Sequence, residues 1–238
     1  MNTVAHPDAR PDFHRPGVGA VLASTWRVGT PERQRAAVEA VRGVWQSREW
    51  PDPGLLAYTV YTGNDGDTLL HYSQWTTEQA FEDFVRTHRD DRNAEIDAAV
   101  PGIERVVLHR YAPPYRSAVL DDRSARTLPG ALAVVEVDFE GPDEARQKGW
   151  VDAVFAAMDD EEGKRPARGG IGAHFHLSTD GTRVLNLAEW EDERAHAEWL
   201  AADASEVGEA WARVRGYPGL TGSRVRRYTP ALSLSAGA

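Results

Sequence analysis

Two histidines placed two residues apart, His174 and His176, are the side chains of this sequence best suited to chemistry. They lie in an alternating apolar segment typical of a β-strand, in which successive side chains point to opposite faces. Both imidazoles therefore point to one face. There they could act as a base near neutral pH, bind a metal ion with Asp180 or Glu136 as an oxygen ligand, or line a ligand without catalytic duty.

The composition excludes several classes of function. The net charge of −10 at pH 7 argues against nucleic acid or an anionic membrane as partner, since both need a basic surface. The absence of cysteine excludes disulfides, thiolate nucleophiles and iron–sulfur ligation. Dinucleotide, P-loop and G-x-S-x-G motifs are absent, as are long apolar runs. We expect a cytoplasmic protein that acts on a small molecule.

An internal repeat shows how the chain positions these residues. The segments Pro101-Gly102-Ile103 and Arg110-Tyr111-Ala112-Pro113 recur, with the same spacing, as Pro218-Gly219-Leu220 and Arg227-Tyr228-Thr229-Pro230. Each copy also contains an Asp-Gly turn between apolar runs, which predicts a β-hairpin. With a strand and a helix before the hairpin and a helix and a strand after it, the predicted order is β-α-β-β-α-β, the ferredoxin-like unit.

The repeat defines the predicted domains: an N-terminal tail at 1–16, copy one at 17–115, a polar linker at 116–128, copy two at 129–232 and a C-terminal tail at 233–238. The helices of a ferredoxin-like unit cover one face of its sheet and leave the other face without a partner. We therefore predict an α+β fold in which the two sheets pack face to face as an intramolecular barrel, with a cavity between them.

Strand alternation selects the side chains expected in that cavity. In copy two they are Glu136, His174, His176, Asn186 and Trp190, with Arg224 and Tyr228 from the last strand, and in copy one they are Trp26, Tyr58, His71 and Trp75. The first five form the predicted catalytic set, because copy two alone combines histidines, a carboxylate and an amide. The other six are predicted to bind substrate. A metal ligand set is not predicted, because copy one has Tyr58 and Val60 at the positions of the paired histidines.

The stretches Gly54-Leu55-Leu56-Ala57-Tyr58 and Ser73-Gln74-Trp75-Thr76-Thr77-Glu78-Gln79-Ala80-Phe81, with their counterparts in copy two, resemble the antibiotic biosynthesis monooxygenases. The resemblance implies a dimeric α+β barrel, formed here by the tandem copies. It also implies the oxidation of aromatic anthrones to quinones by O2 without metal or flavin. An asparagine four residues before the third-strand tryptophan takes part in that family's activity; Asn186 and Trp190 match this pattern, whereas copy one has His71 in place of the asparagine.

These observations lead to the hypothesis of a monooxygenase that needs no cofactor and oxidises a polycyclic aromatic polyketide, with O2 as co-substrate. His174 or His176, tuned by Glu136, would remove a proton, and Asn186 and Trp190 would donate hydrogen bonds to the enolate oxygen. Two alternatives remain open: a polyketide cyclase that uses the same enolate, and a protein that binds an aromatic metabolite without changing it. The chain could also form a homodimer.

Overall fold

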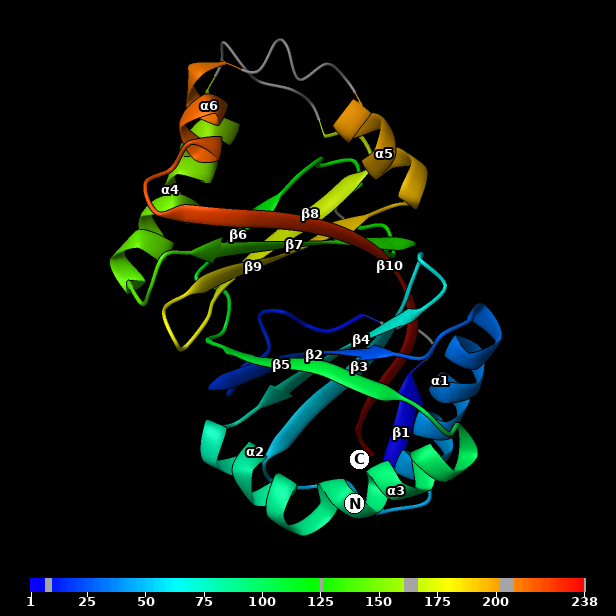
Figure 1. The fold of residues 1–238 in the computed structure, drawn as a ribbon. Helices are drawn as coiled ribbons and strands as arrows, with labels where there is room; N and C mark the ends of the chain where they lie inside the picture. The colour runs from blue at the N-terminus through cyan, green and yellow to red at the C-terminus, as the bar shows by residue number, and fades with distance from the viewer. Residues whose placement is uncertain (7–9, 125, 161–166, 202–207, 238) are drawn as a thin grey trace. The chain divides into compact units, whose positions relative to one another are not determined.

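The computed structural model describes residues 1–6, 10–124, 126–160, 167–201 and 208–237. The chain forms two compact units: unit 1 comprises Met1–Pro113 with Tyr228–Ala238, and unit 2 comprises Pro114–Arg227. Each unit is an antiparallel sheet with helices on one face (Figure 1). Within the described residues, helices that are both long and apolar enough to cross a membrane are not found.

Unit 1 has the predicted β-α-β-β-α-β order. Its elements are β1 (Thr3–His6), β2 (Ala20–Arg27), α1 (Pro31–Gln46), β3 (Leu55–Gly63), β4 (Thr68–Trp75), α2 (Glu78–Phe84), the π-helical turn η1 (Val85–Arg89), α3 (Asp90–Ala99) and β5 (Glu104–Tyr111). The sheet order is β5-β2-β4-β3, followed by the end of β10 and then β1. The α+β class and the ferredoxin-like pattern of this copy are therefore confirmed.

Unit 2 repeats the pattern. Its elements are β6 (Arg116–Val119), β7 (Ala131–Phe139), α4 (Glu144–Asp159), β8 (Gly170–Leu177), β9 (Arg183–Trp190), α5 (Glu193–Ala201), α6 (Glu209–Arg215) and the first part of β10 (Leu220–Ala236). The sheet order is β10-β7-β9-β8-β6. The face-to-face packing of the two sheets stays a prediction.

Each hairpin is closed by the turn that the sequence indicates. Gly66 and Gly181 both adopt φ of +74°, a conformation that side chains other than glycine rarely tolerate. In the first turn, Asp65 accepts hydrogen bonds from the backbone N–H groups of Asp67 and Thr68, at 2.9 Å each. The turn thereby sets the register of the two strands on either side of it.

A buried glutamine anchors each hairpin to the helix that precedes it. The side-chain amide of Gln34 donates to the carbonyl oxygens of Gly63 and Thr68, at 2.8 Å each. Gln147 occupies the same position in unit 2 and donates to the carbonyl of Arg183 at 2.6 Å. This shared contact, which the sequence analysis did not identify, supports the internal repeat.

Strands at the ends of the two copies change the predicted boundaries. The linker at 116–128 begins with β6, which pairs with β8, and part of the C-terminal tail at 233–238 belongs to β10, which pairs with β3. The predicted N-terminal tail at 1–16 contains β1, which pairs with the end of β10. These segments add an edge strand to each sheet, a role that hydrophobic periodicity does not reveal in strands of four residues.

Residues after β1 also pack on unit 1. The ring of Phe13 is 5% exposed and meets the ring of Tyr72 edge to face, with 5.6 Å between centroids. The side-chain amide of Gln74 donates to the carbonyl of Asp12 at 2.7 Å. Tyr72 and Gln74 lie on the sheet face opposite the helices, so this segment covers part of that face.

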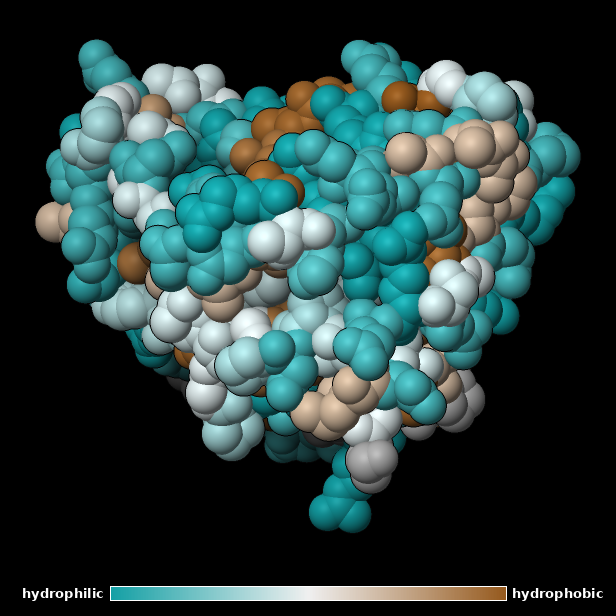
Figure 2. All heavy atoms as spheres, turned by 90° about the horizontal axis from the view of Figure 1, so that it is seen from below, coloured by the Kyte–Doolittle hydropathy of each residue, from teal (hydrophilic) through white to brown (hydrophobic). Residues whose placement is uncertain are grey.

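A separate hydrophobic core lies under the helices of each unit. The core of unit 1 includes Trp45 of α1 and Phe84 of α2, and that of unit 2 includes Trp150 of α4 and Val214 of α6. The outer surface is different: the face shown in Figure 2 carries mainly hydrophilic residues, with hydrophobic residues in small separate groups.

Candidate active site

The face assignment of β7 and β8 agrees with the sequence prediction. Ala173 and Phe175 belong to the core under the helices of unit 2. Their neighbours His174 and His176 therefore point to the opposite face of β8. The same alternation turns Glu136 of β7 away from the helices.

The predicted face of β9 is wrong. Trp190 lies in the core under the helices, and the hairpin register pairs Asn186 with Phe175, which places Asn186 on the same face. Leu185 and Leu187 point to the other face and are buried at 1% and 0% exposure. Because both faces of β9 are buried, polarity along the strand does not identify the helix side, whereas the hairpin register does.

The same correction applies to copy one. Trp26, Tyr58 and Trp75 belong to the core under the helices of unit 1, and His71 contacts the first two. All four were predicted on the opposite face. That face is also aromatic, with Tyr72 buried at 1% exposure, so composition again does not distinguish the two sides.

The structure thus divides the predicted catalytic set. Glu136, His174 and His176 lie on one face of the unit 2 sheet, and Asn186 and Trp190 lie on the other. A sheet separates its two faces by the thickness of its backbone, so these five side chains cannot share one pocket within the unit. The helix side carries the predicted tryptophans of both copies and is the stronger candidate site.

In unit 1, the centre of the helix-side cluster is a hydrogen-bonded pair. The hydroxyl oxygen of Tyr58 lies 2.5 Å from Nδ1 of His71, and the ring of Trp26 packs against the imidazole at a tilt of 37°, with 3.9 Å between centroids. Burial, and to a smaller extent the charge of Arg105, lowers the pKa of His71 to about 3, and burial raises the pKa of Tyr58. Both groups are neutral at pH 7.

Trp75 of unit 1 also has an internal partner. Its indole Nε1 donates to the hydroxyl of Ser73 at 2.9 Å. Its ring packs against Phe81 and Phe84 of α2, with centroids 5.4 and 5.3 Å away. Nε2 of His71, in contrast, is buried without a hydrogen-bond partner among the described residues.

The equivalent cluster of unit 2 is built around Trp190. Its ring lies 5.1 Å from His196 and 5.7 Å from Trp199, both on α5. Nε of Arg227 donates to Nδ1 of His196 at 2.9 Å. Burial, followed by the charge of Arg227, lowers the pKa of His196 to about 4, so this imidazole is neutral at pH 7.

Two buried polar atoms of this cluster lack hydrogen-bond partners in the described part of the chain. They are Oδ1 of Asn186 and Nε1 of Trp190. Unit 2 has Ala188 at the position of Ser73, so the hydroxyl that satisfies Trp75 is missing here. The hairpin register also corrects the sequence alignment: Ala173, and not His174, lies at the position of Tyr58, so the phenol is missing as well.

His196 and Arg227 were not predicted as site residues. The repeat contained the signal: His196 aligns with Phe81, and Arg227 aligns with Arg110. The guanidinium of Arg110 lies over the ring of Phe81 at 5.8 Å. Both copies therefore place an arginine next to this ring, and only in unit 2 is the ring a polar imidazole.

The opposite face of the unit 2 sheet holds the paired histidines. Nδ1 of His174 lies 3.0 Å from the hydroxyl of Ser117, and its Nε2 lies 3.5 Å from a carboxylate oxygen of Glu189. Glu189 and His176 are 1% and 0% exposed. These contacts fit a structural role, and they separate both histidines from Asn186 and Trp190.

The other predicted residues of this face are engaged in ion pairs. A carboxylate oxygen of Glu136 lies 3.7 Å from Arg224 and 3.4 Å from Arg226, and Arg224 also reaches Asp138 at 2.8 Å. Tyr228, at 1% exposure, belongs to unit 1. The structure does not bring Arg224 or Tyr228 to the helix-side clusters.

Among the described residues, groups of three or more His, Cys, Asp or Glu side chains that could hold a metal ion are not found. Asp180, considered as an oxygen ligand, instead accepts hydrogen bonds from Ser178 and Thr182 within the hairpin turn, at 2.7 Å each.

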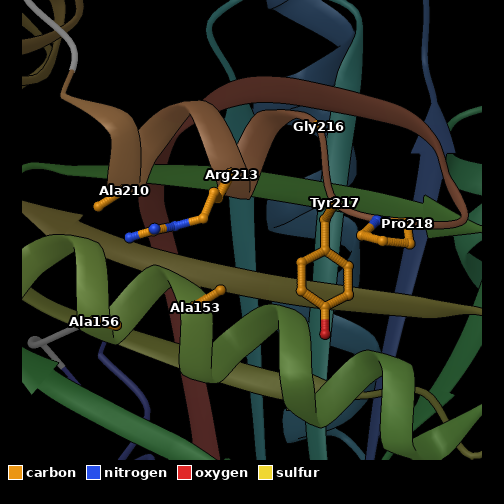
Figure 3. A pocket seen from close by; sticks show the side chains of 7 residues that line it. All are labelled: Ala153, Ala156, Ala210, Arg213, Gly216, Tyr217 and Pro218. Carbon is orange, nitrogen blue, oxygen red and sulfur yellow. The ribbon is translucent and has the colours of Figure 1, made fainter.

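A cavity of about 350 Å³ lies between α4 and the segment formed by α6 and the loop after it (Figure 3). Its lining residues are Ala153, Ala156, Ala210, Arg213, Gly216, Tyr217 and Pro218. The Tyr217 hydroxyl lies so close to Gly149 that a Cβ there would meet it at 2.2 Å. The lining is mainly apolar and does not include residues of the Trp190 cluster.

Comparison with known proteins agrees with this architecture. An anthrone oxidase-like protein of known structure shares the fold, with a TM-score of 0.65 and 15% identity over 99% of this chain and 97% of its own. A candidate monooxygenase from Lactobacillus acidophilus gives a TM-score of 0.55 and 9% identity over 90% and 95% of the two chains. Both likenesses concern the fold.

A Streptomyces coelicolor monooxygenase, solved with nanaomycin D, is 32% identical over 46% of this chain and 90% of its own, with a TM-score of 0.36. The curated proteins contain no match. Residues 26–101, which include the hairpin and the helix-side cluster of unit 1, match the antibiotic biosynthesis monooxygenase family, and unit 2 repeats their pattern. The chain therefore belongs to the antibiotic biosynthesis monooxygenase family.

Proposed function

We propose that this protein is a cofactor-independent monooxygenase that oxidises a polycyclic aromatic polyketide intermediate, an anthrone or a phenol, to a quinone. Family membership supports a function of the monooxygenase type. The anthrone oxidase-like neighbour, which aligns over nearly the whole chain, supports this substrate class. We assign the reaction to the helix-side cluster of unit 2.

One observation carries this assignment. Trp190 and Asn186 keep buried polar atoms without partners in the described residues, whereas Ser73 satisfies the equivalent tryptophan of unit 1. An unsatisfied buried polar group costs roughly 1–3 kcal/mol. A ligand that supplies the missing hydrogen bond explains why the indole N–H of Trp190 is left without the partner that Trp75 has.

The proposed chemistry needs no external electron donor. An anthrone that loses a proton becomes an electron-rich carbanion, which transfers an electron to O2 and then combines with the reduced oxygen to form a hydroperoxide. Loss of water from the hydroperoxide gives the quinone. One oxygen atom enters the ketone and the other leaves as water, so the substrate CH2 group supplies all the electrons.

The residues of the cluster would promote this reaction by stabilising the anion. Trp190 offers an indole N–H, and Arg227 places a positive charge beside the cluster. N–H donors aimed at an oxyanion favour the ionised substrate. The imidazole of His196, with its low pKa, is a poor base, so the proton would pass to solvent when the anion binds. The proposal gives no base role to His174, His176 or Glu136.

Oxygen uptake with 1,8-dihydroxyanthrone tests the proposal. We expect the protein to consume one O2 for each quinone formed, above the rate of spontaneous oxidation, and without added metal or flavin. Protein denatured beforehand is the control for the spontaneous reaction. Product formation without oxygen consumption would favour the cyclase alternative, and binding without conversion would favour the carrier.

A further inference from the structure

The position of His196 is the main chemical difference between the two copies. In unit 1, Arg110 lies 5.8 Å over Phe81 and forms an ion pair with Glu78 at 4.0 Å. In unit 2, Arg227 keeps the equivalent ion pair, with Glu193 at 3.7 Å. The arginine and its acidic partner are thus repeated, and the ring below the arginine changes from phenyl to imidazole.

The contact with Arg227 determines the protonation of the imidazole. A guanidinium N–H is always a donor, because arginine stays protonated in proteins. Nδ1 of His196, 2.9 Å from Nε of Arg227, must therefore be the acceptor and carry a lone pair. The proton of the neutral ring then lies on Nε2. Arg227 already occupies Nδ1, so any hydrogen bond that the ring offers to a ligand comes from Nε2–H.

The surroundings of this donor suit a flat aromatic anion. The imidazole packs on the indole of Trp190 at 5.1 Å and is nearly parallel to Trp199 at 6.4 Å. The side chain of His196 is buried at 4% exposure, which strengthens electrostatic interactions by excluding water. In the described part of the chain, the charged group that bonds this ring is Arg227, which in turn pairs with Glu193.

We propose that His196 is a neutral oxyanion donor, whose Nε2–H bonds the phenolate or enolate oxygen of an aromatic ligand beside Trp190, and that Arg227 is the positioning residue that fixes its tautomer. This inference rests on the proposed function of the unit 2 cluster. It adds a preference: the site favours an ionised oxygen over a neutral hydroxyl, because the hydrogen bond from Nε2–H is stronger to an oxyanion and Nε2 cannot accept the proton of a hydroxyl.

The test uses 1,8-dihydroxyanthraquinone, whose absorbance reports ionisation of the phenol and which does not react with oxygen. The wild-type protein should bind the ionised dye and lower the pKa of its phenol. His196→Phe, which reproduces the arginine-over-phenyl packing of unit 1, should weaken binding of the ionised dye by about tenfold to a hundredfold. Binding of the neutral dye should change little.

Two further measurements separate the donor from a packing role. His196→Gln, which keeps a neutral N–H donor, should recover most of the dye pKa shift. Nitrogen-15 NMR of the wild type should show the Nε2–H tautomer of His196 at pH 7, and Arg227→Met should release it. A wild-type protein that fails to lower the pKa of the dye, an unchanged shift in His196→Phe, or an Nδ1–H tautomer would each overturn the proposal. Absence of oxygen uptake with an intact dye shift would count against the oxygenase alone.

Discussion

The helix-side clusters of the two units use the same scaffold in different ways. In unit 1, Ser73 satisfies the indole N–H of Trp75, and Tyr58 bonds the imidazole of His71. In unit 2, the equivalent of Ser73 is an alanine, and the indole N–H of Trp190 has no partner among the described residues. Unit 1 thus pairs the indole N–H of its tryptophan internally, whereas in unit 2 the equivalent N–H is left without a partner in the described part of the chain.

The difference shows what a tandem duplication permits. A homodimer of single copies must carry the same residues in both sites, whereas a fused pair can specialise them separately. The hydrogen bonds of unit 1 contribute to the free energy of unfolding, because a buried polar group without a partner destabilises the folded state. Under the proposed function, the unpaired groups of unit 2 lower stability and would serve to bind a ligand, an exchange of stability for function that is common in proteins.

The largest expected effect is loss of turnover on changes in unit 2. Trp190→Phe removes the N–H donor while it keeps a ring in the core, and should lower kcat by about 10²- to 10³-fold, the usual cost of one oxyanion donor. The matched change in unit 1, Trp75→Phe, should leave kcat within about threefold of wild type, because the Trp75 N–H already bonds Ser73. Initial rates of oxygen uptake measure both. An equal loss in both variants would show that both copies are active.

The second prediction concerns the hydrogen-bonded pair of unit 1. Tyr58→Phe leaves Nδ1 of His71 buried without its partner and should lower the free energy of unfolding by about 1–3 kcal/mol. Tyr115→Phe is the control, because its hydroxyl bonds Asp152 at the surface and its loss should change stability by less than about 0.5 kcal/mol. Urea denaturation gives both values. A neutral Tyr58→Phe would mean that the cluster is looser than its contacts indicate.

Local patterns were enough to predict most of the fold. The repeated Pro-Gly and Arg-Tyr segments and the two Asp-Gly turns predicted the two β-α-β-β-α-β units, which the structure has. The short strands β1 and β6 were not predicted, because four residues are too few to show an alternating hydrophobic pattern. Their places are fixed by pairing with distant strands, which the local sequence does not specify.

The candidate site was predicted only in part. Asn186 and Trp190 were selected by type, but their side of the sheet was wrong, because buried apolar residues occupy both faces of β9. The hairpin register, which pairs Asn186 with Phe175, would have corrected it. His196 was not predicted as a site residue, because a histidine in the apolar stripe of a helix is ordinarily a core residue. Its partner Arg227 also lies 31 residues away in the sequence.

The third prediction uses pH. The pKa of His71 in the folded state is about 3, below its ordinary value of 6.5, so between these values the unfolded chain binds a proton that the folded chain does not. The contribution of His71 to stability is therefore present above about pH 6.5 and is lost as the pH falls toward 3, at up to about 1.4 kcal/mol per pH unit. His196, with a pKa of about 4, acts in the same direction.

His71→Asn introduces the residue that unit 2 has at this position, Asn186. It should remove the contribution of His71 to the pH dependence of stability. Its free energy of unfolding, measured in urea between pH 7 and pH 4.5, should fall less steeply than that of the wild type, by up to about 1.4 kcal/mol per pH unit at the acidic end of this range. Equal slopes in wild type and His71→Asn would mean that His71 is protonated in the folded state.

The smallest expected effect comes from exchanging one hydroxyl between the units. Ala188→Ser places a hydroxyl where unit 1 has Ser73, within reach of the indole N–H of Trp190, and should weaken binding of the ionised anthraquinone dye by about fivefold, because the donor becomes occupied. The reciprocal change, Ser73→Ala, should lower the free energy of unfolding by about 1 kcal/mol, because it leaves the N–H of Trp75 buried without its partner. Dye titration and urea denaturation measure the two effects. If Ala188→Ser left dye affinity unchanged, the N–H of Trp190 would not contact the ligand, and the difference between the two clusters would concern packing alone.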